Sequence, residues 1–275
     1  MDFSKTFIDD LCQYYNIDYE QATKLGVRSD GRKPSLPGSE TCSPVKNMTL
    51  GDIWAAKPRN TEEDIFQFYR DQGAWSAFRQ VVRHIELIPA HHDVWNSFVT
   101  ATMGLARPLH IVEYGCGVAP WCRTFIETLT PFHENLEISI SDIDECEHFL
   151  FANWRLNNIV SKRNLNVTVH SVPVVPHKLP QYVMPIDFVI LFEVLEHVPN
   201  PINVIKNLYE QMRKGATLLE NFIQHEPGDD GDGPDLSSAA EERAGYYKFL
   251  HQNFTIVYGD NEIIDPNSTR VWQKK

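Results

Sequence analysis

From Pro108 to the end of the chain, short apolar runs alternate with stretches of helical periodicity. This alternation is typical of a parallel sheet whose strands are joined by helices. The pattern therefore predicts an α/β fold with a mostly parallel, doubly wound sheet. The predicted parallel strands are 109–113, 136–141, 165–172, 187–192 and 216–223, and two late strands, 253–259 and 269–273, would pair as an antiparallel edge.

Besides the helix that follows the first strand, three helices are predicted between or after these strands. The first presents Cys146, Phe149, Leu150 and Trp154 on one face. The second presents Val204, Ile205, Leu208 and Met212, with Pro201 in its first turn and Gly215 at its end. The third covers 237–251.

Residues 1–105 are predicted to form an N-terminal helical cap region with a Gly, Pro and Ser-rich loop at 26–48, ahead of a main domain at 106–275. A capping box at Thr61 predicts a helix that runs to Ile85 with a break at Gly73, and another helix is predicted at 95–103. The aromatic residues of 66–78 at helical spacing are interpreted as core, with some able to cover a substrate pocket.

Charge disfavours nucleic acid as a partner, because 25 Lys and Arg against 37 Asp and Glu leave a net charge of −12. No apolar run approaches the roughly 20 residues of a membrane span, and acids stand at the start of the chain where an export signal would carry bases. The five cysteines form no CxxC pair. We therefore expect a cytoplasmic protein with reduced thiols that acts on a small molecule; the pattern predicts no oligomeric state.

The most informative motif is the glycine turn at 111–120, where a strand runs into a helix. Gly115 and Gly117 let the backbone turn tightly and approach a ligand. A dinucleotide site would place a third glycine at Pro120, and no phosphate-binding lysine motif is present. Glu113 stands two residues before the first glycine, and an acid there suits a cationic ligand such as S-adenosylmethionine.

The E-x-G-x-G pattern resembles the first motif of class I S-adenosylmethionine-dependent methyltransferases, a Rossmann-like family, and the region 109–223 follows that family's motif order. The resemblance implies cofactor contacts by the residues Glu113, Tyr114, Gly115, Cys116 and Gly117.

Asp142 follows the second strand, 25 residues after Gly117. The resemblance implies that its carboxylate accepts hydrogen bonds from both ribose hydroxyls. It also implies that Ile143 packs on the adenine and that Ser171 and Val172 lie beside it, although the acid common at the end of the third strand is missing. The alternative for Asp142 is the N-cap of a helix at 144–157.

The segment Phe192 to Pro201 is similar to the E-V-L-E-H-V-x-x-P segment of ubiquinone-pathway O-methyltransferases. The resemblance implies that Phe192 and Glu193 line the methionine end of the cofactor. Glu193, Glu196 and His197 also form a set that could hold a divalent metal with a later histidine, His225 or His251. The alternative is a structural helix start.

Catalytic roles are assigned to His225, Glu196 and His197. His225 follows the fifth strand, where a histidine has a pKa suited to taking a proton from a hydroxyl. A solvent-exposed loop histidine is the alternative. The acidic run 227–235 is interpreted as a solvated loop or as a lid over a cationic substrate.

The sequence thus predicts methyl transfer from S-adenosylmethionine to a small-molecule acceptor, with a slight preference for a hydroxyl. An RNA 2′-hydroxyl methyltransferase would share the E-x-x-E-H set, but it should carry a basic stripe. A non-catalytic cofactor-binding scaffold or partner subunit is a second alternative. An NAD enzyme is a third, which Pro120 opposes.

Overall fold

The computed structural model describes residues 3–21, 54–74, 76–81, 108–130, 135–223, 235–260 and 268–275. Its centre is a seven-stranded sheet in the order β3-β2-β1-β4-β5-β7-β6. The strands are β1 (Leu109–Tyr114), β2 (Leu136–Ser141), β3 (Val167–Ser171), β4 (Ile186–Phe192), β5 (Met212–Asn221), β6 (Phe254–Tyr258) and β7 (Arg270–Lys274). The first five pair in parallel, whereas β7 runs antiparallel to both β5 and β6.

The predicted fold class is confirmed, since every predicted strand is present with small shifts at its ends. The chain order crosses back at β1, so β2 and β4 flank β1 and their carboxyl ends meet at one edge. In open parallel sheets, ligands bind at such a switch point.

Helices cover both faces of the sheet. On one face, α7 (Pro120–Leu129) and α8 (Glu147–Arg163) pack on a core that includes Ile111, Ile138 and Ile190. On the other, α9 (Pro201–Gln211) and α10 (Ser237–Asn253) pack on a core that includes Val189 and Leu218. Burial of these apolar faces is the main driving force for the layered arrangement.

One predicted boundary is wrong. Met212 fits the helical spacing of Val204 and Leu208, but α9 ends at Gln211 and Met212 begins β5, paired with Ile186. Apolar spacing alone does not separate the last turn of a helix from a strand that follows without a loop. Pro201 does open α9, as predicted.

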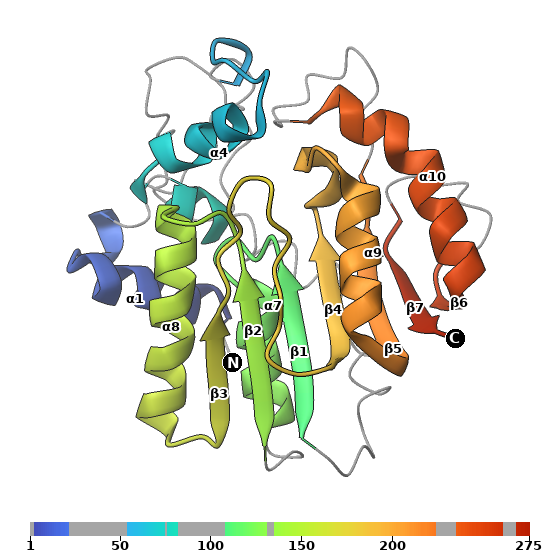
Figure 1. Cartoon of the computed structure of the whole chain (residues 1–275). Helices are drawn as coiled ribbons and strands as arrows, with labels where there is room; N and C mark the ends of the chain where they lie inside the picture. The colour runs from blue at the N-terminus through green and yellow to red at the C-terminus, as the bar shows by residue number, and fades with distance from the viewer. Residues whose placement is uncertain are drawn as a thin grey trace.

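Helix α4 (Glu62–Asp71) begins with the predicted capping box, in which Thr61 and Asp64 exchange hydrogen bonds. The chain turns at Gly73, and residues 76–81 are helical again. Figure 1 shows α4 above the tips of the parallel strands, on the carboxyl side of the sheet. Helix α4 therefore lies where the switch point predicts a ligand.

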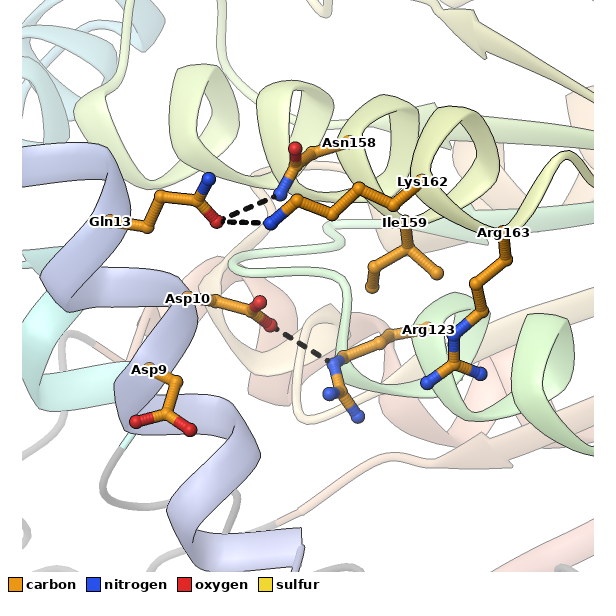
Figure 2. Close-up of a pocket in the computed structure, with 8 residues that line it drawn as sticks. All are labelled: Asp9, Asp10, Gln13, Arg123, Asn158, Ile159, Lys162 and Arg163. Carbon is orange, nitrogen blue, oxygen red and sulfur yellow. Dashed lines mark hydrogen bonds and ion pairs between the residues drawn. The ribbon is translucent and has the colours of Figure 1, made fainter.

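Helix α1 (Phe3–Tyr15) packs beside α8, where Phe7 and Phe151 share a buried cluster. Asp10 accepts a hydrogen bond from Nε of the buried Arg123 at 3.2 Å and lies 3.2 Å from Nε of Arg155. Figure 2 shows Asp10 reaching Arg123 across a pocket of about 230 Å³ between α1, α7 and α8. An apolar cluster and ion pairs thus hold α1 against the main sheet layer.

In the described residues, no helix is both long and apolar enough to cross a bilayer. The predicted loop at 26–48 and the predicted helix at 95–103 lie outside the described residues. The division into a cap region and a main domain at 105/106 stays a prediction.

Candidate active site

The loop after β1 passes through left-handed backbone conformations at Gly115, with φ of +64°, and at Gly117, with φ of +52°. The amide of Cys116 donates a hydrogen bond of 3.0 Å to the carbonyl of Ser141, which ties the turn to the end of β2. Space is also short, because a Cβ on Gly115 would lie 2.4 Å from Cγ1 of Val194. Conformation and packing both require glycine here.

The side chains of Tyr114 and Cys116 are buried in the two core layers, at 5% and 2% exposure. Their backbone, rather than their side chains, is the part able to meet a ligand. The cofactor contacts predicted for these two residues stay predictions.

Glu113 faces the start of α7. Its Oε2 accepts from the amide of Cys122 at 2.7 Å, and its Oε1 accepts from the amide of Trp121 at 3.4 Å. Burial raises the pKa of Glu113 to about 7, and the hydrogen bonds from the helix amides act against this rise. The carboxylate therefore satisfies amides at the helix N-terminus. Direct contact between Glu113 and a cofactor stays a prediction.

Asp142 follows β2 and contacts the glycine turn that follows β1. Its Oδ2 accepts from the amide of Gly117 at 2.6 Å, and its Oδ1 accepts from the amide of Ile143 at 2.7 Å and lies 3.2 Å from Nε2 of His148. The other ring nitrogen of His148 lies 3.1 Å from the hydroxyl of Ser76. Burial opposes ionisation of Asp142, but His148 and the two amides outweigh it, so its pKa is lowered.

A carboxylate has about four acceptor positions, and three on Asp142 are filled. One position on Oδ2 has no hydrogen-bond partner among the described residues, and the contact of Asp142 with a ribose stays a prediction. The alternative interpretation of Asp142 as a helix N-cap is wrong, because α8 begins at Glu147 with Cys146 at the cap position. His148 and Ser76, which support this carboxylate, were missed in the sequence.

The residues predicted beside the adenine lie along the same edge. Ile143 is half-buried and bridges to Val174, whose amide donates to the carbonyl of Asp142 at 2.8 Å. Ser171 is exposed at the end of β3, and the amide of Val172 donates to β2 at 2.9 Å. The structure brings these residues to one side of Asp142, and their adenine contacts stay predictions.

At the end of β4, Glu193 adopts a left-handed conformation with φ of +53°. Its amide donates a hydrogen bond of 2.6 Å to Oδ1 of Asn221 at the end of β5. Such strain in a non-glycine residue persists where the surroundings enforce it, often at functional sites. The preceding Phe192 packs its ring 5.0 Å from that of Trp121. Asn221 was missed, although a polar residue closing an apolar strand is a usable signal.

Glu196 and His197 lie in η1 (Leu195–His197), a short 3₁₀ turn after β4. Glu196 is 5% exposed, and its Oε2 has no hydrogen-bond partner among the described residues. Nε2 of His197 lies 3.8 Å from Oε1 of Glu196, and Nδ1 lies 3.2 Å from Asp235. Burial raises the pKa of Glu196 to about 7, against the effect of His197. A buried carboxyl that titrates near neutrality suits proton transfer.

In the part of the chain that the structure describes, no three His, Cys, Asp or Glu side chains are grouped closely enough to hold a metal ion. Glu193, Glu196 and His197 therefore do not fit a metal by themselves. His225 lies outside the described residues. The N-cap residue of α10, Leu236, donates its amide to the carbonyl of Glu196 at 2.9 Å. His251 lies near the opposite end of this helix and is therefore distant from Glu196.

Tyr69 belongs to α4, which lies above the carboxyl ends of the parallel strands (Figure 1). Its hydroxyl is buried without a hydrogen-bond partner in the described ranges. Burial raises the pKa of this hydroxyl well above its ordinary value, and the charges of Asp142 and Glu196 add to the rise. The next residue, Arg70, donates from Nε to the carbonyl of Asp144 at 2.9 Å. Helix α4 is thus attached to the loop after β2, and the Tyr69 hydroxyl is exposed to the negative charge of both carboxylates.

A family model described as "Methyltransferase domain" matches residues 89–255, more than half of the chain. The chain belongs to this methyltransferase family. This match agrees with the glycine turn, the acid after β2 and the sheet order. No curated protein matches the chain.

Solved methyltransferase structures resemble the chain at low identity. A putative sarcosine dimethylglycine methyltransferase from Galdieria sulphuraria is 16% identical with a TM-score of 0.38, over 50% of this chain and 47% of that one. PigF with SAH is 15% identical with a TM-score of 0.46, over 76% and 62%. Magnesium protoporphyrin IX methyltransferase from Synechocystis PCC 6803 with bound SAM is 16% identical with a TM-score of 0.45, over 72% and 82%. The chain thus spans about half to four fifths of these proteins.

Proposed function

We propose that the protein transfers a methyl group from S-adenosylmethionine to a hydroxyl of a small molecule. The observation that carries the proposal is the contact between Asp142 and Gly117, 2.6 Å long, at the edge where β1 and β2 end. A carboxylate whose pKa is lowered, beside a backbone turn whose two glycines lack side chains, supports the assignment of Asp142 to the ribose hydroxyls.

The cofactor supplies a methyl group on a positively charged sulfur, and the electrons of the broken carbon–sulfur bond leave with that sulfur. The protein then has two tasks, which are to align the acceptor with the methyl group and to receive the acceptor's proton. Tyr69 supports the first task, because its buried hydroxyl is available for a hydrogen bond near Asp142 and Glu196.

Glu196 supports the second task. With a pKa raised to about 7 by burial, a large fraction of this carboxyl is ionised at neutral pH and is still basic enough to take a proton. His197 lies 3.8 Å from Glu196 and 3.2 Å from Asp235, which makes it the second candidate for proton transfer at this turn. His225 remains the alternative base. The preference for a hydroxyl, and membership of the ubiquinone-pathway-like group, rest on the resemblance of the segment from Phe192 to Pro201.

The test is methyl transfer from S-adenosylmethionine with a tritiated methyl group to separate panels of hydroxylated metabolites, amine metabolites and bulk RNA. We expect label in a hydroxylated metabolite. Label in RNA alone would support the 2′-hydroxyl alternative. Cofactor binding without any transfer would support a scaffold.

The same assay after exhaustive chelation tests the predicted divalent ion at Glu193, Glu196 and His197. Because the described residues form no ligand set, we expect turnover to persist. Loss of turnover that Mg²⁺, Mn²⁺ or Zn²⁺ restores would instead support the ion.

A further inference from the structure

Buried polar atoms without hydrogen-bond partners gather on one short segment above the sheet edge. Among the described residues these include the hydroxyl of Tyr69, Nε2 of Gln72 and Oε1 of Gln80. Together with Ser76, they lie between 69 and 80, on the two helical stretches that flank the turn at Gly73. A buried polar group without a partner costs free energy, so native proteins rarely keep several together unless a ligand or water meets them.

Two contacts hold this segment against the sheet edge. The hydroxyl of Ser76 lies 3.1 Å from His148, which in turn lies 3.2 Å from Asp142. A Cβ on Gly117 would lie 2.0 Å from Oε1 of Gln80 and 2.9 Å from its Cδ. The amide of Gln80 therefore rests directly against the glycine turn, on the side that lacks a side chain.

The proposed cofactor carries an ammonium group on its aminoacyl chain, and the sequence offers Glu113 as its partner. Both carboxylate oxygens of Glu113 are instead bound to amides at the start of α7. The amide of Gly117 is bound to Asp142. Gln80 Oε1 is a buried acceptor at the same turn, and it has no partner among the described residues.

We propose that Gln80 binds the cofactor, with its side-chain oxygen accepting a hydrogen bond from the ammonium group beside Gly117. This inference rests on the proposed function, because it assumes that S-adenosylmethionine occupies the turn. It assigns a residue of the N-terminal region to cofactor binding, outside the motifs of the sheet. The segment from Tyr69 to Gln80 then closes over the cofactor as well as over the acceptor.

The experiment compares S-adenosylhomocysteine with 5′-methylthioadenosine, which lacks the aminoacyl chain, by calorimetric titration of the full chain. Gln80→Met keeps the length of the side chain and removes its acceptor. We expect the variant to bind S-adenosylhomocysteine about tenfold or more weakly, as for the loss of a hydrogen bond to a charged group. Its affinity for 5′-methylthioadenosine should stay within about twofold of the wild-type value. Gln80→Glu, which keeps an acceptor oxygen, should retain affinity for both ligands.

Gln67→Met is the matched control, since the side chain of Gln67 lies on the exposed side of α4 and bonds to Asp71 at 2.7 Å. It should change neither affinity. If Gln80→Met lost equal affinity for both ligands, or lost none for S-adenosylhomocysteine, the inference would be overturned. Binding of S-adenosylhomocysteine by the wild type would still uphold the proposed function. A wild type that binds neither ligand would overturn both.

Discussion

The carboxylate of Asp142 accepts a hydrogen bond of 2.6 Å from the amide of Gly117, so the end of β2 holds the turn that follows β1. The same carboxylate meets His148, which contacts Ser76. Asp142 and His148 together thus link three segments that are distant in sequence, those of Ser76, Gly117 and Asp142 itself. An acid proposed to bind the cofactor also organises the turn on which the cofactor would lie.

Gly117→Ala tests the turn. The left-handed φ of +52° disfavours alanine, and its Cβ would displace Gln80 from a position 2.0 Å away. We expect affinity for S-adenosylhomocysteine to fall at least tenfold, with a stability loss of roughly 1–2 kcal/mol in chemical unfolding. Gly73→Ala is the control, because Gly73 also has positive φ but a Cβ there meets nothing within 4 Å. Equal affinity losses in the two variants would contradict the account.

Glu196→Gln tests the base. Once an acceptor is known, kcat should fall by roughly 10²–10⁴ in a variant that still binds S-adenosylhomocysteine. In the wild type, kcat should rise with pH through about 7, since the base acts when ionised and burial raises the pKa of Glu196 to about 7. A Glu196→Gln variant with the full rate and the same pH profile would remove Glu196 from the mechanism.

Glu220 tests the electrostatics of the core away from the site. It is fully buried in β5, and its Oε1 accepts from Nε1 of Trp272 at 2.9 Å. Burial raises its pKa from 4.5 to about 7, against the effects of Trp272 and Arg270. A carboxyl with a raised folded pKa contributes stability that is complete below about 4.5 and is lost as pH rises through about 7.

Glu220→Gln removes this dependence. The unfolding free energy of each protein is measured with urea, and the wild-type value is subtracted from that of the variant. This difference should increase by about 2–3 kcal/mol between pH 4.5 and pH 8. A difference that stays constant over this range would show that Glu220 titrates normally.

Asp10→Ala tests the attachment of α1. The substitution leaves the guanidinium groups of Arg123 and Arg155, which are 1% and 0% exposed as side chains, without this acid. We expect a loss of about 3 kcal/mol in unfolding free energy, as when one partner of a buried ion pair is removed. Asp9→Ala, at the exposed neighbouring position, should cost less than about 0.5 kcal/mol. Similar losses in both variants would contradict the proposed role of Asp10.

The strand order and the placement of Asp142, Phe192 and Glu196 at one edge follow from patterns within the chain, because alternating strands and helices leave few ways to build a parallel sheet. The direction in which Glu113 points does not follow from them. Its spacing from Gly115 suits a ligand, but the amides of α7 compete for the same carboxylate and bind both its oxygens.

Gln80 shows the other limit of sequence reasoning. Nothing in its neighbourhood marks it, and its position against Gly117 arises from the packing of the N-terminal segment over the sheet. The start of β5 at Met212 is likewise decided by pairing with Ile186 rather than by local propensity.

Titration of S-adenosylhomocysteine into the wild type and into Asp142→Ala tests the central claim most directly. We expect binding by the wild type and at least a tenfold weaker affinity in the variant, since charge-assisted hydrogen bonds worth roughly 1.5–3 kcal/mol are lost. Asp144→Ala, two residues along the same loop, should bind as the wild type does. Unchanged affinity in a folded Asp142→Ala protein, or no binding by the wild type, would contradict the account.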